Sequence, residues 1–183
     1  MSHQRTRTPF QSRIATQLDI PRIKELMALS MQKLLPDVLT PEQVEKSKAS
    51  MGLDTQLIDD GTYFLVYDGK SLVGCGGWSR RRTLFGGNHT VGRDEALADP
   101  AYEAAKIRAM YTHPDHVRRG IGRFLLHLGE NAARAEGFKT AELGATASGQ
   151  LLYEKCGYTV IEDLSETDND GISVPIILMR KKL

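Results

Sequence analysis

The sequence predicts a single mixed α/β domain, with a twisted, mostly antiparallel sheet flanked by helices. The chain has 183 residues, which is the size of one typical domain. Apolar residues make up 40% and charged residues 26%, as in chains that bury a core. The predicted order of elements, β-α-α-β-β-β-α-β-α-β-β, is that of a mixed α/β sheet, and no repeat or break in composition divides the chain. We therefore expect one domain over residues 10–183, preceded by a loose polar arm over residues 1–9.

The first quarter of the chain predicts a short strand followed by two helices. We expect the strand over residues 10–15 and a helix over residues 19–35, where Pro21 falls in the first turn. Thr40-Pro41-Glu42-Gln43 combines a capping hydroxyl with proline at the first helical position. This pattern predicts a second helix that ends near Gly52.

The next segment predicts an antiparallel hairpin and a long loop. Residues 62–67 are β-branched and aromatic, Asp68-Gly69 is a hairpin turn signal, and residues 71–78 form a second apolar run. Glycines 74, 76 and 77 weaken the second strand and permit a bulge or a close approach of backbone. Residues 79–100 show no period, and long loops of this kind are usually functional or disordered.

The second half of the chain predicts a strand, the clearest helix, and a further set of strands. In residues 104–112, Ile107, Ala109 and Tyr111 alternate with more polar neighbours, as in a strand with one buried face. Residues 120–137 carry apolar side chains at helical spacing and end at a glycine. The remaining expected elements are a strand over 140–145, a short helix over 148–155, and strands over 158–162 and 174–179.

Charge, hydropathy and cysteine usage exclude several classes of protein. The 24 Lys and Arg residues nearly balance the 23 Asp and Glu residues, so no surface built for nucleic acid or anionic lipid is expected. No apolar run approaches the ~20 residues that span a bilayer, and the first residues lack a secretory signal. Cys75 and Cys156 lie far apart and suggest neither a disulfide framework nor a zinc site. We expect a soluble cytoplasmic protein with reduced thiols and no metal.

A basic, glycine-containing turn links the strand over 104–112 to the helix over 120–137. It reads Val117-Arg118-Arg119-Gly120-Ile121-Gly122-Arg123. Unpaired N–H groups and the positive end of the helix dipole favour an anion at such a junction, where glycines let it approach. A dinucleotide fingerprint would need glycine where Leu125 stands, and the chain has no P-loop. The turn predicts a different phosphate site, and a plain glycine turn is the alternative.

This turn resembles the signature of the GNAT family of acetyl-CoA-dependent N-acetyltransferases, Arg/Gln-x-x-Gly-x-Gly/Ala at the start of a helix. Val117 stands where the family has Arg or Gln, which removes a side-chain contact and leaves the backbone donors. Residues 151–158, Leu-Leu-Tyr-Glu-Lys-Cys-Gly-Tyr, resemble the family's late helix and strand. The family's asparagine upstream of that tyrosine is absent, and Thr146 stands at about its place. The resemblance covers roughly residues 14–179.

The resemblance implies an acyl-CoA N-acyltransferase fold and direct transfer of an acetyl group from acetyl-CoA to a primary amine of a small molecule or peptide. It implies that Tyr153 protonates the departing thiolate; a tyrosine on a short helix is otherwise a packing residue. Backbone groups of the strand pair with pantetheine and polarise the thioester carbonyl in this family. The implied cofactor contacts are Met110, Tyr111, Thr112, Arg118, Arg119, Gly120, Ile121, Gly122 and Arg123. A non-catalytic acyl-CoA sensor of the same fold is the alternative function.

Other features of the site stay open at this stage. The general base is one of Glu103, His113, Asp115 and His116, or water, and His113-Pro114-Asp115 can equally be a strand-ending turn. The cluster Arg80-Arg81-Arg82 either binds an acidic group of the acceptor or forms a solvated loop. An acidic run either steers a cationic amine or forms a soluble hairpin loop, and it comprises Glu162, Asp163, Glu166, Asp168 and Asp170. The sequence does not identify the acceptor, whether the acyl group is strictly acetyl, or whether the chain forms a homodimer.

Overall fold

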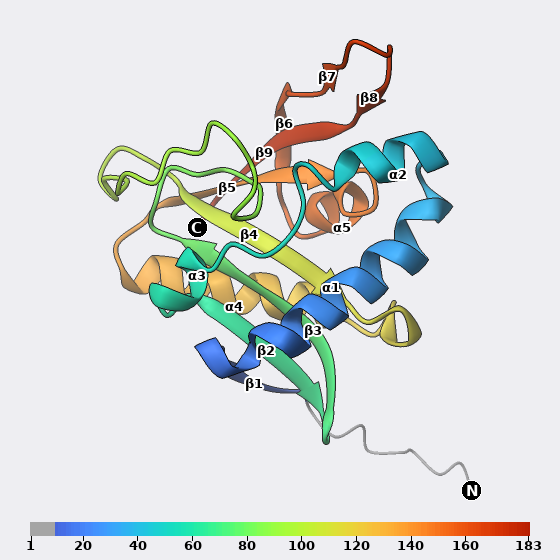
Figure 1. The fold of residues 1–183 in the computed structure, drawn as a ribbon. Coiled ribbons are helices and arrows are strands. Elements are labelled where there is room, and N and C mark those ends of the chain that lie inside the picture. Colours follow the sequence, from blue (N-terminus) through green and yellow to red (C-terminus); the bar gives the residue numbers. More distant parts are fainter. Residues whose placement is uncertain (1–9) are drawn as a thin grey trace, which may run out of the picture.

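The computed structural model describes residues 10–183, which form a seven-stranded sheet with helices on both faces (Figure 1). The arm expected over residues 1–9 lies outside the described residues. The strand order is β1-β2-β3-β4-β5-β9-β6, and every neighbouring pair is antiparallel except β4 and β5. The expected mixed, mostly antiparallel sheet is therefore confirmed.

The helices and strands follow the expected order closely. The strands of the sheet are β1 (Gln11–Ile14), β2 (Tyr63–Asp68), β3 (Ser71–Ser79), β4 (Ala105–Thr112), β5 (Thr140–Thr146), β6 (Thr159–Asp163) and β9 (Ile176–Lys182). The helices are α1 (Ile20–Leu34), α2 (Pro41–Ser47), α3 (Gln56–Asp59), α4 (Ile121–Ala135) and α5 (Gln150–Lys155). A two-stranded hairpin of β7 (Glu166–Thr167) and β8 (Ser173–Val174) extends from the sheet. None of the helices within residues 10–183 is long and apolar enough to span a membrane.

The expected second helix is too long, because α2 ends at Ser47 and not near Gly52. Its start is as predicted: Thr40 and Gln43 form a reciprocal capping box. The hydroxyls of Ser47 and Ser50 then donate to main-chain carbonyls three residues upstream. Such bonds compete with the helical ladder and favour its end. The four-residue α3 and the two short strands β7 and β8 carry no periodic signal and were not predicted as elements.

The core is divided by the sheet into two layers. On one face, α1 and the segment around α3 pack their apolar side chains on β2 and β3, with Ile23, Leu57 and Tyr63 buried there. On the other face, α4 packs on the sheet with Leu125, Leu126 and Ile121. Figure 1 shows α1 and α4 on opposite sides of the strands. The C-terminal parts of β4 and β5 lie between these two layers, so residues of both layers can reach a site there.

Strand β4 contains a bulge that breaks the expected alternation of its side chains. Gly77 pairs with Arg108 and Cys75 with Tyr111, so Ala109 and Met110 together face Gly76 of β3. Ala109 has a positive φ of 51°. A regular strand would direct Ile107 and Ala109 to one face, but Ile107 packs in the α4 layer and Ala109 in the α1 layer. The prediction that residues 107, 109 and 111 share a face is therefore wrong, because the inserted residue shifts the register of the side chains.

The bulge is followed by a separation of β4 from β5. These parallel strands pair only at Ala105 with Ala141 and at Lys106 with Glu142. Beyond that point β5 continues to pair with β9 over its full length, whereas β4 stays with β3. A gap in the ladder thus opens in the middle of the sheet, next to Ala109.

The glycines of β3 allow the close approach that the sequence suggested. An ideal Cβ on Gly77 would lie 2.2 Å from the Thr62 carbonyl oxygen and 2.9 Å from the Tyr63 Cα. We expect Gly77→Ala to lower the free energy of unfolding by about 1–3 kcal/mol, because backbone cannot move aside as a side chain can. Gly122→Ala is the matched control, since its Cβ meets only the tip of the Leu152 side chain. Urea denaturation of both variants measures this; equal losses would contradict the backbone clash.

Candidate active site

A cavity of about 520 Å³ lies where β4 and β5 separate. One end is bounded by the turn before α4 and by α5, and the other by the end of α1 and two loop segments, residues 50–52 and 84–86. The middle of the cavity is bordered by Ile107–Thr112 of β4 and by Leu143, Gly144 and Thr146 of β5. The cavity therefore passes through the sheet from the α4 layer to the α1 layer.

The first end of the cavity is the basic turn that the sequence singled out. Arg118 and Gly120 both adopt left-handed backbone conformations, with φ of 61° and 89°. Gly120 is the N-cap of α4 and has no side-chain capping bond, so the first N–H groups of this 15-residue helix point out of its end. A Cβ on Gly120 would meet nothing within 4 Å. The turn is thus an open cradle of backbone donors, suited to an anion.

The arginines of this turn have different environments. Arg118 and Arg123 line the cavity, as does Lys155 of α5. Arg119 does not: its guanidinium donates to Asp68 Oδ2 at 2.6 Å and contacts His116 Nδ1 at 2.6 Å. The remaining expected contact residues, Met110 to Thr112 and Gly120 to Gly122, all line the cavity. The structure therefore brings the expected set together except for the Arg119 side chain.

The bulge in β4 is fixed from the α1 layer by two tyrosines. The hydroxyl of Tyr63, which is fully buried, donates to the Ala109 carbonyl at 2.7 Å. The hydroxyl of Tyr111 accepts a hydrogen bond from the Gly52 N–H at 3.0 Å. Burial raises the pKa of both phenols, so both stay neutral. The hydrogen bond from Tyr63 holds the left-handed residue in place.

Tyr153 borders the same cavity from α5. Its ring packs edge-on against Tyr158 with ring centroids 6.1 Å apart, next to Leu152 and the α4 layer. Loss of solvent around the hydroxyl raises the pKa of Tyr153 to about 12, with the nearby Cys156 as a second cause. The phenol is thus fully protonated at neutral pH and can donate a proton.

Of the four side chains considered as general base, only His116 lines the cavity. Glu103 is bound by Arg82 in a bidentate pair at 2.7 and 3.1 Å, which lowers the pKa of that carboxyl to about 2. His113 Nδ1 accepts the Asp115 N–H in a turn that ends the strand. His116 lies in the turn before Val117, at the basic end of the cavity. No Asp or Glu within residues 10–183 lines the cavity.

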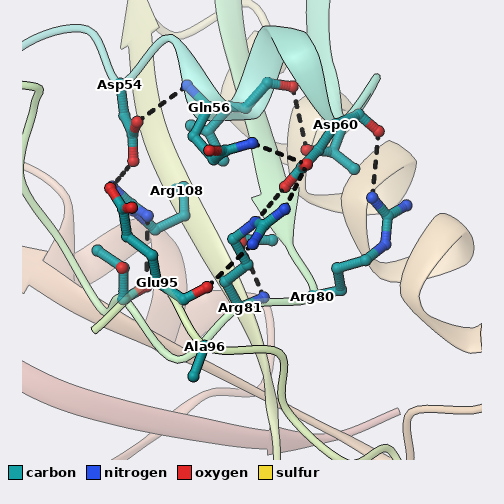
Figure 2. A network of polar contacts seen from close by, with 12 residues as sticks. Asp54, Gln56, Asp60, Arg80, Arg81, Glu95, Ala96 and Arg108 are labelled. Atoms are coloured by element: carbon teal, nitrogen blue, oxygen red, sulfur yellow. Dashed lines mark hydrogen bonds and ion pairs between the residues drawn. The ribbon is translucent and has the colours of Figure 1, made fainter. Parts of the chain in front are cut away.

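The arginine cluster at residues 80–82 is bound to carboxylates of the protein itself. Arg80 pairs with Glu136 at 2.6 and 2.9 Å. Arg81 pairs with Asp60 at 2.7 and 2.9 Å (Figure 2). Arg82 holds Glu103 as described above. The interpretation as an acceptor site is wrong, because none of the three arginines lines the cavity. Arg82 is exposed at the start of the loop, as the alternative had it, but each of the three guanidinium groups is bound to a carboxylate. They fasten the start of the long loop to α3, to α4 and to the approach to β4.

Arg108 and Asp54 form a buried ion pair that sequence reasoning missed. Arg108 Nη2 lies 3.0 Å from Asp54 Oδ2, and their side chains are 1% and 4% exposed. Arg108 also donates to the carbonyls of Gly86 and Thr83 at 2.8 and 3.3 Å. It thereby ties the long loop and the segment before α3 to β4, as Figure 2 shows in part. The only sequence signal is an arginine within a strand pattern, because its partner lies 54 positions away.

Glu166, Asp168 and Asp170 of the acidic run lie in a hairpin, as the plainer interpretation had it, whereas Glu162 and Asp163 belong to β6. Residues 166–174 form β7 and β8, and Lys46 of α2 pairs with Asp168 and Asp170 at 2.6 and 3.0 Å. The Gln43 side chain donates to the Ser173 carbonyl at 2.8 Å. These contacts tie the hairpin to α2 and neutralise part of its charge.

Comparison with known proteins connects this geometry with a family. The family profile described as "Acetyltransferase (GNAT) domain" matches residues 59–160, which is more than half of the chain. No curated protein sequence matches the chain.

Solved structures share the fold at low sequence identity. A GCN5-related N-acetyltransferase from Rhodopseudomonas palustris superposes with a TM-score of 0.69 at 19% identity, covering 97% of this chain and 98% of that one. The PaiA N-acetyltransferase from Thermoplasma acidophilum, in complex with coenzyme A, gives 0.62 at 14%, with 96% and 100% covered. YncA from Salmonella typhimurium, a putative acetyltransferase with its cofactor acetyl-CoA, gives 0.59 at 18%, with 96% and 95% covered. With the profile match and the fold together, the chain belongs to the GNAT family of acetyltransferases.

Proposed function

We propose that the protein transfers an acetyl group directly from acetyl-CoA to a primary amine of a small molecule or peptide. The observation that carries the proposal is one continuous cavity. It joins the open turn at Gly120 to the gap between β4 and β5, with Tyr153 on its wall. A cavity of about 520 Å³ has the size of a small-molecule site.

The residues at the basic end fit the phosphates of a coenzyme A molecule. The backbone N–H groups at the start of α4 offer hydrogen bonds, and the open space at Gly120 admits an anion. Arg118, Arg123 and Lys155 add positive charge at the same end. The contribution of Arg119 is limited to its backbone, since its guanidinium is bound to Asp68.

Acetyl-CoA supplies a thioester, whose carbonyl carbon is open to attack by an amine. The backbone around Met110 is free of the β5 ladder and borders the cavity, so an N–H there can donate to the thioester oxygen. Tyr63 holds this backbone through the Ala109 carbonyl. The Tyr153 hydroxyl donates its proton to the sulfur as the carbon–sulfur bond breaks. Holding both reactants in one cavity makes the attack effectively unimolecular.

In this proposal the proton of the attacking amine leaves to water, and water returns a proton to the Tyr153 phenolate. Glu103, His113 and Asp115 do not line the cavity, and His116 lies at the basic end, next to the phosphate turn. The acceptor therefore reacts as the free amine and needs no carboxylate of the protein.

We expect Gly120→Glu to abolish acetyl-CoA binding. The new side chain would fill the open cradle and place a negative charge against the phosphates. Gly92→Glu is the matched control, because Gly92 also has a positive φ and open space but does not line the cavity. Calorimetry measures the affinities; tight binding by the Gly120 variant, or an equal loss in the control, would contradict the placement of the phosphates.

We expect Tyr153→Phe to lower kcat by about 10²–10⁴-fold while the affinity for acetyl-CoA stays nearly unchanged, because only the proton donor is removed. Tyr67→Phe is the control, because this change also removes one hydroxyl and Tyr67 does not line the cavity. Release of free thiol with an accepted amine gives kcat. If Tyr153→Phe turns over as fast as the parent protein, Tyr153 is a packing residue. If the parent releases no thiol with any amine, the protein binds acetyl-CoA without turnover.

We expect the pH dependence of kcat/KM to follow the acceptor. The fraction of free amine rises with pH, so the rate rises until the pKa of that amine. The raised pKa of Tyr153, about 12, keeps the donor protonated, so no decline in rate arises from it between about pH 6 and about pH 10. The profile is measured with two amines of different pKa, for the parent and for His116→Gln. An inflection that stays at one pH for both amines, or that disappears in His116→Gln, would show a base on the protein.

A further inference from the structure

The end of the cavity opposite the basic turn, which we call the acceptor end, has mostly apolar walls, with Ser30 and Ser50 as polar lining residues from α1 and the first loop segment. Its apolar lining side chains, from the end of α1 and the two loop segments, are Met31, Leu34, Leu35, Met51, Leu84 and Phe85. All but Leu35 are only half-buried, so they keep surface free toward the cavity. Phe85 lies directly on β5, because a Cβ on Gly144 would meet its Cδ1 at 3.3 Å. An acceptor that reaches the gap between β4 and β5 therefore passes this ring.

This end of the cavity offers no free charge to a substrate. Arg108 is its one charged lining residue within the described part of the chain, and it donates to Asp54, Gly86 and Thr83. Asp54 is in turn shared by Arg108 and Arg93, at 3.0 and 2.8 Å, and Arg93 also pairs with Glu95 at 2.5 Å. Two arginines and two carboxylates thus balance one another. A second ammonium group on a substrate would lose its water here without gaining a counter-ion.

Hydrogen bonds hold the loop segments that border this end of the cavity. Asn88 N–H donates to the Leu53 carbonyl at 3.0 Å, and the Thr90 hydroxyl donates to the Ala49 carbonyl at 2.8 Å. His89 Nε2 lies 2.7 Å from the Lys48 carbonyl. These bonds fasten the part of the long loop that follows Phe85 to the segment after α2, and Arg108 binds the carbonyls of Thr83 and Gly86 on both sides of Phe85. The apolar wall is therefore pre-formed, as in many small-molecule sites.

We propose that the acceptor is a compact monoamine on an aromatic or aliphatic body, and not a polyamine or a lysine-rich peptide. The proposal rests on the function proposed above and names its substrate class. The apolar body would contact Phe85, Met31 and Met51, while its amine faces the thioester beside Ala109. The part of the cavity bordered by β4 must also hold the pantetheine arm, so the remaining space suits a body of about one ring.

The test compares phenethylamine with putrescine and spermidine. With acetyl-CoA saturating, we expect kcat/KM for phenethylamine to exceed that for either polyamine by about 100-fold or more. A second arm measures amine binding by calorimetry on the protein saturated with coenzyme A, where no transfer takes place. We expect phenethylamine to bind at least about tenfold more tightly than putrescine. Equal or tighter binding of putrescine, or no binding of phenethylamine, would overturn the proposal.

Two variants at position 85 test whether the Phe85 side chain causes the preference for a monoamine. Phe85→Glu places a carboxylate in the wall, so the preference should shift toward putrescine by about tenfold or more, and Phe85→Ala should weaken phenethylamine without favouring putrescine. Tyr102→Glu is the control, because Tyr102 belongs to the same connection, is 90% exposed and does not line the cavity. An unchanged preference in Phe85→Glu would overturn the proposal. Calorimetry measures amine binding at the acceptor end even if the protein releases no thiol. A lack of acetyl-CoA binding would refute only the proposed function.

Discussion

The site depends on the separation of β4 from β5, and that separation begins at one residue. Ala109 holds a left-handed conformation in the middle of a buried strand, which costs about 1–3 kcal/mol for a residue other than glycine. Surrounding contacts offset this: Tyr63 bonds the Ala109 carbonyl, and the flanking Arg108 and Tyr111 are both anchored in the α1 layer. Without the bulge, β4 could continue its ladder with β5 and close the cavity. The cavity between β4 and β5 therefore depends on the strained conformation of Ala109.

The bulge also decides which layer each neighbour of the cavity joins. Because one residue is inserted, Arg108 and Tyr111 both reach the α1 layer, while Ile107 and Met110 pack against α4. Arg108 then gathers Asp54 and the carbonyls around Phe85 into the wall of the acceptor end. One irregularity in the backbone thus links the conformation of β4 to the shape of the opposite wall.

Local patterns predicted the fold and the basic end of the cavity, because both depend on neighbours in sequence. Helical spacing and Gly120 located the start of α4, β-branched and apolar runs located β2 and β3, and alternation located β4. Ala109 gave no signal, since alanine has no preference for a positive φ and only tertiary contacts impose it. The arginines at 80–82 were read from their charge alone, yet their carboxylate partners lie 21 to 56 positions away. Such pairs are fixed by the folded chain, so a charge run does not show whether it is free or internally bound.

The net charge of +1 conceals a clear separation of charge within the cavity. At the basic end, Arg118, Arg123 and Lys155 form no ion pair with a carboxylate of residues 10–183. At the acceptor end, Arg108 and Arg93 are neutralised by Asp54 and Glu95. This distribution favours an anionic ligand at one end only, and under the proposed function the apolar end would select against additional charge. Because the two ends lie on opposite sides of the gap between β4 and β5, this polarity would place two chemically different reactants in line across it. The direct transfer that we propose would require such an arrangement.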